Sequence, residues 1–178
     1  MEITDQILLN DLKNGKKTAY EQVFKKYYKP LALKAYMMLE DEMEAEDLVQ
    51  NLFISMWQKS HYQSVNSSLK AYLFRAVHNQ CLMALRTRKV TQQKMDEYTE
   101  RINLEEDIEQ SEQTGSENTI NIALNELPAQ RQKAFKLVYM ENKKYQDAAN
   151  EMGLSVNSIK THLKLAVKML QEKLITFR

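Results

Sequence analysis

Helix-breaking and cross-linking residues are scarce in this chain. Its 178 residues include three glycines, two prolines and one cysteine. Glycine and proline both destabilise the interior of a helix, so their scarcity favours helical structure. A single cysteine excludes an intramolecular disulfide and a zinc site built from cysteines. The composition therefore predicts an all-α fold that does not rely on covalent cross-links.

Long apolar stretches and leader signals are missing as well. No run of residues stays apolar over the length that a bilayer requires. The first residues, MEITDQ, have neither the basic start nor the apolar stretch of a signal peptide. We therefore expect a cytoplasmic protein with no membrane insertion of its own.

Signatures of catalysis and of metal binding are also absent. The three glycines lie far apart, so they form no glycine-rich phosphate loop. His61, His78 and His162 are distant in sequence and show no metal-ligand pairing of the His-x-x-x-His kind. We therefore expect no enzyme activity, no catalytic residues, no bound metal and no cofactor.

Charge is strongly segregated along the chain, although the formal net charge is only +1. Residues 40–47 carry acids and no base, residues 66–94 carry bases and no acid, and residues 96–117 are acidic again. The C-terminal segment is rich in lysine. Because binding responds to the local field, a near-neutral total does not argue against a nucleic-acid partner.

The spacing of apolar residues predicts two small helical domains, residues 1–92 and 120–178, joined by a flexible acidic linker at residues 93–119. Thr4 is expected to cap a first helix that ends at Asn14-Gly15. Thr18 with Glu21 and Asp41 with Glu44 show the capping-box pattern for the next helices. Pro30 is expected to interrupt or kink its helix.

Two further helix starts are predicted in the same way. Ser67 or Ser68 is placed to cap a helix over residues 69–88, and Pro128 suits the first position of a helix in the second domain. The clearest helix of the chain follows Asp41. Its apolar residues keep helical spacing without a gap: Ala45, Leu48, Val49, Leu52, Phe53, Met56 and Trp57.

Residues 145–174 have the pattern of a helix-turn-helix. Ala148 and Ala149 lie within a short helix, Gly153 suits a left-handed turn, and Ser155 can cap the next helix. The second helix of such a motif lies in the DNA major groove. Its buried side is predicted to be Ile159, Leu163, Ala166, Val167 and Leu170. Its outward face carries Asn157, Ser158, Lys160, Thr161, Lys164 and Lys168. The competing interpretation is a plain helical hairpin with solvated lysines.

The basic helix over residues 69–89 offers a second candidate surface. Arg75, Asn79 and Arg86 fall along its exposed side, and Tyr72, Phe74 and the polar loop around Tyr62 lie beside it. Basic and aromatic groups of this kind suit unstacked single-stranded bases. From spacing alone, a basic surface helix with core aromatics explains the pattern equally well.

Three segments, in order, resemble the extracytoplasmic-function (ECF) class of bacterial sigma factors. The first is AEDLVQ at residues 45–50, followed by Phe53 and Trp57. The second is LKAYLF at residues 69–74, a sequence similar to that of a branch of the class common in Bacteroidetes. The third is Leu127-Pro128 followed by the helix-turn-helix. The resemblance covers nearly the whole chain and implies an alternative sigma factor that directs RNA polymerase core to promoters.

The resemblance also implies partners and site residues. The partners would be RNA polymerase core, through its β′ clamp and β flap, promoter DNA and an anti-sigma factor. Met83 stands where the family usually has Asp or Asn. Contacts to core polymerase would come from Asp47, Gln50 and Asn51. Contacts to the −10 element would come from Tyr62, Gln63, Ser64, Asn66, Arg75, Asn79 and Arg86. Contacts to the −35 element would come from Asn157, Ser158, Lys160, Thr161 and Lys164.

Two other functions remain as alternatives. A self-sufficient helix-turn-helix regulator would need a dimer to read two half-sites, and it has no use for the Asp47–Gln50 motif. A purely helical adaptor protein would show no DNA affinity at any salt concentration.

Overall fold

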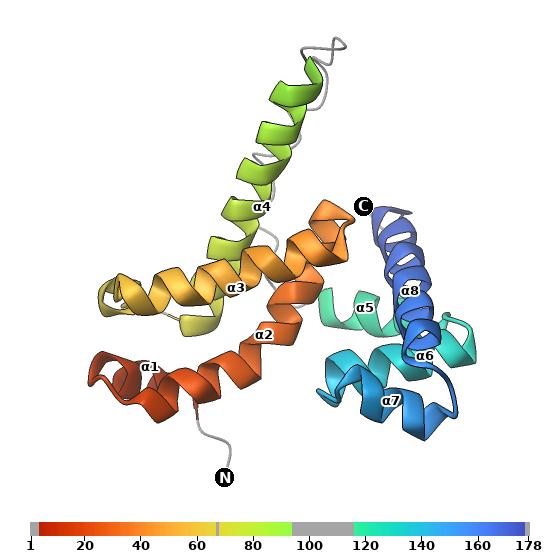
Figure 1. Ribbon diagram of the computed structural model, residues 1–178, viewed down its shortest axis with the longest axis horizontal. Helices are drawn as coiled ribbons and strands as arrows, with labels where there is room; N and C mark the ends of the chain where they lie inside the picture. Colours follow the sequence, from red (N-terminus) through yellow and green to blue (C-terminus); the bar gives the residue numbers. More distant parts are fainter. Residues whose placement is uncertain (1–3, 67, 94–115, 177–178) are drawn as a thin grey trace. The chain divides into compact units, whose positions relative to one another are not determined.

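The computed structural model describes residues 4–66, 68–93 and 116–176 of the chain. Over these ranges the backbone forms helices and turns, with no strand among them. The chain splits into two compact units, Met1–Met95 and Asp96–Arg178 (Figure 1). The prediction of an all-α fold is confirmed. Most of the predicted acidic linker, residues 93–119, lies outside the described residues.

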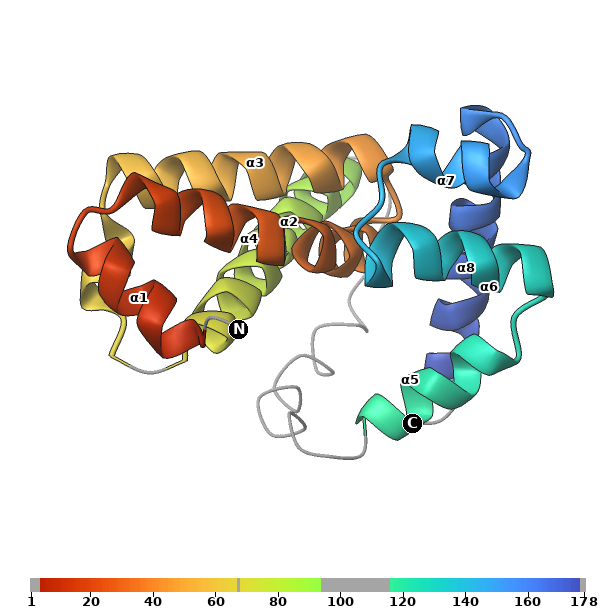
Figure 2. The ribbon, with the colours of Figure 1, turned by 90° about the horizontal axis from the view of Figure 1, so that it is seen from below.

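The first unit is built from four α-helices and one short 3₁₀ helix among its described residues. In chain order they are α1 (Asp5–Lys13), α2 (Lys17–Leu39), α3 (Glu42–Gln58), η1 (His61–Ser64) and α4 (Leu69–Gln93). The views in Figures 1 and 2 show α3 lying along α2, with α4 crossing beside them. The shorter α1 packs on α2 and also contacts α4 and η1.

An aromatic cluster holds α2 and α3 together. The ring of Phe53 is 1% exposed, and its centroid lies 5.0 Å from that of Phe24 in an edge-on arrangement. The centroids of Tyr20 and Trp57 are 4.7 Å apart. Aromatic pairs at such distances add about 0.5–1.5 kcal/mol to the free energy gained by burying their surface. The cluster therefore fixes how the two helices lie against each other.

Two of the predicted caps in the first unit are confirmed. The carboxylate of Asp41 accepts a hydrogen bond of 2.9 Å from the Glu44 backbone N–H. The hydroxyl of Ser68 accepts one of 3.2 Å from the backbone N–H of Ala71. Each bond satisfies one backbone donor that the first turn of a helix leaves without a partner.

Two other expectations about helix ends need correction, and the expectation for Pro30 holds in one of its two forms. Helix α2 begins at Lys17, so Thr18 lies within its first turn and does not cap it. Thr4 stands at the N-cap of α1, but its side chain makes no capping hydrogen bond. Of the two outcomes expected for Pro30, an interruption or a kink, the helix shows no interruption: α2 runs through Pro30 and is bent along its length (Figure 1). A proline inside a helix removes one backbone hydrogen bond, which explains a bend without a break.

The second unit packs three helical segments around one long helix. Its elements are α5 (Ser116–Asn125), α6 (Ala129–Phe135), a π-helical turn η4 (Lys136–Met140), α7 (Tyr145–Met152) and α8 (Val156–Thr176). Helices α5, α6 and α7 each contact α8 (Figure 2). The predicted buried side of α8 is confirmed at every position: Ile159, Leu163, Ala166, Val167 and Leu170.

The turn between α7 and α8 has the predicted helix-turn-helix geometry. Gly153 ends α7 in the left-handed conformation, with a φ of 64°. The hydroxyl of Ser155 accepts a hydrogen bond of 3.1 Å from the Ser158 backbone N–H and so caps α8. Pro128 precedes α6 as its N-cap, one position earlier than expected. None of the described helices combines the length and the apolar character needed to cross a membrane.

The left-handed turn leads to a first prediction. Gly153→Ala should lower the free energy of unfolding by about 1–2 kcal/mol, because an L-residue is strained at this φ. No heavy atom lies within 4 Å of where the new Cβ would stand, so strain alone sets the cost. Gly153→Asn is the control, since asparagine tolerates this conformation better. Urea denaturation followed by circular dichroism measures both, and equal losses for the two variants would contradict the explanation.

Candidate nucleic-acid interface

The exposed side of α3 carries the residues predicted to contact core polymerase. Asp47, Gln50 and Asn51 are all exposed, as expected from their positions off the buried stripe of the helix. The Gln50 side-chain amide donates a hydrogen bond of 3.2 Å to the Tyr28 hydroxyl on α2. Burial raises the pKa of Tyr28, the hydrogen bond from Gln50 partly opposes this rise, and the carboxylates of Glu46 and Asp47 add to it. Tyr28 therefore stays a neutral phenol beside an acidic surface.

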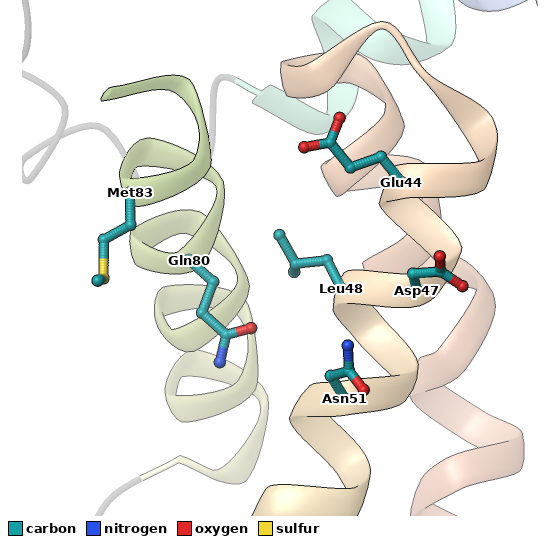
Figure 3. A pocket seen from close by; sticks show the side chains of 6 residues that line it. All are labelled: Glu44, Asp47, Leu48, Asn51, Gln80 and Met83. Atoms are coloured by element: carbon teal, nitrogen blue, oxygen red, sulfur yellow. The ribbon is translucent and has the colours of Figure 1, made fainter. Parts of the chain in front are cut away.

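A shallow hollow between α3 and α4 adjoins this surface (Figure 3). Leu48 of α3 points toward α4, and Gln80 of α4 extends toward α3. Three large apolar side chains of α3 and α4 are exposed, namely Met43 at 77%, Ile54 at 51% and Met83 at 65%, and of these Met83 lines the hollow. Sequence reasoning missed Met43 and Ile54. Ile54 could have been found, because it continues the exposed spacing of Asp47 and Asn51. The six residues lining the hollow are Glu44, Asp47, Leu48, Asn51, Gln80 and Met83.

One arginine ties the far half of α4 to the turn between α2 and α3. The Arg88 guanidinium donates a hydrogen bond of 3.0 Å to the backbone carbonyl of Leu39, at the end of α2. The same side chain forms an ion pair with Glu44, in the first turn of α3. A cation near the last carbonyls of a helix also interacts favourably with the helix dipole. Arg88 thus fixes α4 relative to the helix that carries Asp47.

A second, narrower pocket lies between η1 and the start of α4. It joins the polar loop to the basic helix, the two segments that sequence reasoning placed side by side. Burial raises the pKa of Tyr72, so its phenol remains neutral next to Arg75. The pocket is lined by Ser64, Val65, Asn66, Ala71, Tyr72 and Arg75.

The loop itself is anchored to the core, and this corrects the expectation for Tyr62. Its side chain is 6% exposed, and its ring centroid lies 6.5 Å from that of Trp57. Tyr62 is therefore a packing residue and does not present its ring at the surface. Val65 is also buried, at 5% exposure. Between them, the amide of Gln63 donates a hydrogen bond of 3.1 Å to the backbone carbonyl of Lys13 in α1.

Further along α4, the predicted polar residues form one exposed stripe. Arg75, Asn79 and Arg86 are all exposed and lie at helical spacing. Met83 falls on the same stripe and also lines the hollow beside α3. The stripe thus runs from the pocket at the start of α4 to the surface that carries Asp47.

The side of α8 predicted to face outward is exposed and basic, apart from Ser158, which is half-buried. Lys160, Lys164 and Lys168 are exposed, repeat every four residues and form no ion pair with a described residue. Two smaller side chains are engaged locally. The Ser158 hydroxyl lies 2.9 Å from that of Ser155, and the Thr161 hydroxyl donates a bond of 3.0 Å to the Asn157 carbonyl.

Lys143, between η4 and α7, differs from the lysines of α8 because carboxylates surround it. Lys143 lies 3.2 Å from a carboxylate oxygen of Glu141 and also forms an ion pair with Glu151. Hydrogen bonds to these two carboxylates raise the pKa of Lys143, so the ammonium stays charged, but the two negative charges beside it offset its field. Lys143 is thus a poor candidate for a phosphate contact, whereas the lysines of α8 keep their charge available.

The part of the chain that the structure describes contains no group of three His, Cys, Asp or Glu side chains that could hold a metal ion. Cys81 is fully buried, and burial raises the pKa of its thiol to about 11. Its sulfur therefore stays protonated and packs as an apolar group.

The fold and its basic surfaces define a helical DNA-binding protein of two units, the second of which is a helix-turn-helix. Residues 23–91 match the family model for sigma-70 region 2, and residues 120–170 match the model for sigma-70, region 4. These two domains of one family together cover well over half of the chain. The chain therefore belongs to the sigma-70 family, and it is an alternative sigma factor that acts with RNA polymerase core on promoter DNA.

Three solved structures are similar to the chain. The sigma factor RpoE from Bartonella quintana, in a co-crystal with the anti-sigma factor NepR, is 27% identical; the match covers 89% of this chain and 98% of that one, with a TM-score of 0.40. The structure of CnrH in complex with the cytosolic domain of CnrY is 20% identical, covers 97% of each chain and has a TM-score of 0.43.

A third structure, the RsbN–BldN complex, is 16% identical, covers 92% of this chain and 97% of that one, and has a TM-score of 0.38. At such TM-scores these likenesses carry no argument, so the family assignment depends on the two domain models. No curated protein matches the chain significantly.

The tether between Gln63 and α1 leads to a second prediction. Gln63→Leu removes the donor to the Lys13 carbonyl, and one such hydrogen bond is worth about 1 kcal/mol. Local opening of the loop should then become about fivefold more frequent. Amide hydrogen exchange at Val65, whose N–H donates to the Tyr62 carbonyl, measures this opening. Gln58→Leu, at the end of α3, is the matched control and should leave exchange at Val65 unchanged.

Proposed function

We propose that this sigma factor belongs to the ECF class and that its three surfaces divide the work of initiation. The exposed side of α3 binds the β′ clamp of RNA polymerase core through Asp47, Gln50 and Asn51. The pocket beside η1 and the stripe on α4 open the −10 element. The basic side of α8 reads the −35 element in duplex form.

The pocket between η1 and α4 is the observation that carries this proposal. A base can be read on its Watson–Crick edge only after it leaves the duplex stack. The pocket combines a half-buried aromatic ring, an amide and a guanidinium, from Tyr72, Asn66 and Arg75. Such groups stack on a base and donate hydrogen bonds to its edge. Asn79 lies one turn further along α4 and extends the same surface.

Helix α8 supplies the complementary, sequence-reading contact. Asn157, Ser158 and Thr161 lie on the same exposed side as Lys160 and Lys164. Amide and hydroxyl groups can bond to base edges in the major groove, while lysines bind phosphates. Each surface needs only modest affinity, because polymerase links them and effective concentration adds their contributions.

Several further assignments extend the proposal. The β flap of polymerase would hold the second domain, and the acidic linker would avoid duplex phosphate. An anti-sigma factor is proposed as a partner, as the resemblance to the ECF class implies. The protein would act in the cytoplasm, without catalytic residues or cofactors of its own. The sequence of residues 69–74 supports membership of a Bacteroidetes-like branch of the ECF class.

A self-sufficient regulator is the weaker candidate. Such a protein has no need for a region 2 domain, which matches residues 23–91. It also gives no role to the pocket between η1 and the basic helix α4. The adaptor alternative explains neither of the two matched domains.

The third prediction concerns polymerase binding. Asp47→Ala combined with Gln50→Ala should weaken co-purification with core polymerase, because both side chains lie on the exposed side of α3. Helical content should not change, since neither residue is buried. Glu21→Ala with Gln22→Ala is the matched control: it also removes one acid and one amide, from exposed positions on α2. Equal retention of both double variants on core polymerase would exclude the assigned surface.

The fourth prediction concerns strand opening. Asn79→Ala should leave closed-complex binding nearly unchanged, because duplex contacts through α8 remain. It should slow formation of the open complex, since the variant loses a contact to unpaired bases. Permanganate reactivity of thymines in the −10 region follows this step directly. A promoter with a pre-melted bubble should partly restore the rate, because the cost of unpairing has already been met.

Two outcomes would decide against this function. If Asn79→Ala weakens the closed complex as strongly as the open complex, Asn79 contacts duplex DNA. If wild-type protein with core polymerase never produces reactive thymines on a promoter that it selects, the strand-opening role is wrong.

A further inference from the structure

One lysine of the α8 surface differs from the others in its surroundings. The Nζ atom of Lys160 lies 5.4 Å from the centroid of the Tyr145 ring. Tyr145 is the first residue of α7, so the contact spans the helix-turn-helix from the start of one helix to the exposed side of the other. Among the described residues, Lys164 and Lys168 have no aromatic ring at such a distance.

The distance falls within the range of a cation–π interaction, which extends to about 6 Å from the ring centroid. The ring attracts the ammonium group on one side only. The three N–H donors of a lysine can therefore keep the ring contact and still reach a phosphate or a base edge. The Tyr145 ring therefore holds the ammonium group of Lys160 in one position and leaves its charge available to DNA.

Placement matters because a lysine side chain has many rotamers. Its conformational entropy amounts to about 2 kcal/mol, and a side chain that is free in solution loses part of this on binding. Lys160 is exposed, so few other contacts restrict it. The Tyr145 ring restricts it before DNA arrives, and this lowers the entropic cost of the contact.

We propose that Tyr145 is a positioning residue for the DNA contact of Lys160. This inference rests on the proposed role of α8 at the −35 element. Tyr145 acts through its ring face and not through its hydroxyl, and it acts on Lys160 and not on Lys164.

A double-mutant cycle tests the proposal. Wild type and variants are assembled with core polymerase, and closed-complex affinity is measured on a duplex promoter fragment that the wild-type holoenzyme selects from random sequence. Tyr145→Leu should weaken binding about two- to fivefold, the range expected for an exposed cation–π pair. Tyr145→Phe and Tyr145→Trp should bind like wild type, since both keep an aromatic face.

The partner is identified in two variant backgrounds. Tyr145→Leu should have no further effect when Lys160→Ala is already present. It should keep its full effect in the Lys164→Ala background, which is the matched control. The salt dependence separates positioning from direct contact: Lys160→Ala should lower the slope by about 1, whereas Tyr145→Leu should leave it unchanged.

Each opposing outcome has its own meaning. Loss of binding in Tyr145→Phe equal to that in Tyr145→Leu would assign the hydroxyl to DNA and overturn the proposal. Additive losses with Lys160→Ala would also overturn it, since the two residues would act independently. Wild-type affinity in Lys160→Ala itself would refute the proposed role of that lysine. If Tyr145→Leu unfolds the second unit, wild-type binding by a folded Tyr145→Met variant overturns the proposal as well.

Discussion

The burial of one side of α3 is the constraint on which the first unit depends. Ala45, Val49, Leu52 and Met56 are between 0% and 4% exposed, so the orientation of the helix is set by packing against α2 and α4. The opposite side is then necessarily exposed, and it carries Asp47 and Asn51. The surface proposed to bind polymerase is in this way held rigid by the core behind it.

The same helix also supports the loop that follows it. Trp57 stands at the end of α3, where its ring packs between Tyr20 and Tyr62. The loop is thus continuous with the aromatic cluster, and α4 begins directly after it. Arg88 fixes the other half of α4 to the start of α3. Both ends of the proposed DNA-opening helix are therefore held in place by the same helix, α3.

Patterns with a local physical cause could be predicted from the sequence. Helical spacing correctly predicted the buried side of α8, and the caps made by Asp41, Ser68 and Ser155 each depend on residues within three positions. The Thr18–Glu21 pattern failed because a capping motif does not show where the preceding turn ends. Gln63 and Lys13 are 50 residues apart, and no local pattern indicates their hydrogen bond. The burial of Tyr62 depends in the same way on where Trp57 lies in space.

In the loop over residues 62–66, the residues that fix the loop to the core differ from those exposed at the pocket. Tyr62 and Val65 are buried, whereas Ser64 and Asn66 are exposed at the pocket. A substitution at either exposed position changes the chemistry offered to a ligand but removes no packed surface. Under the proposed function, relatives of this protein could diverge in the base they prefer by single substitutions there, which at Ser64 also remove a hydrogen bond of 2.9 Å to the His61 carbonyl. Under the same proposal, these two positions are the first targets for designing a sigma factor with a different promoter.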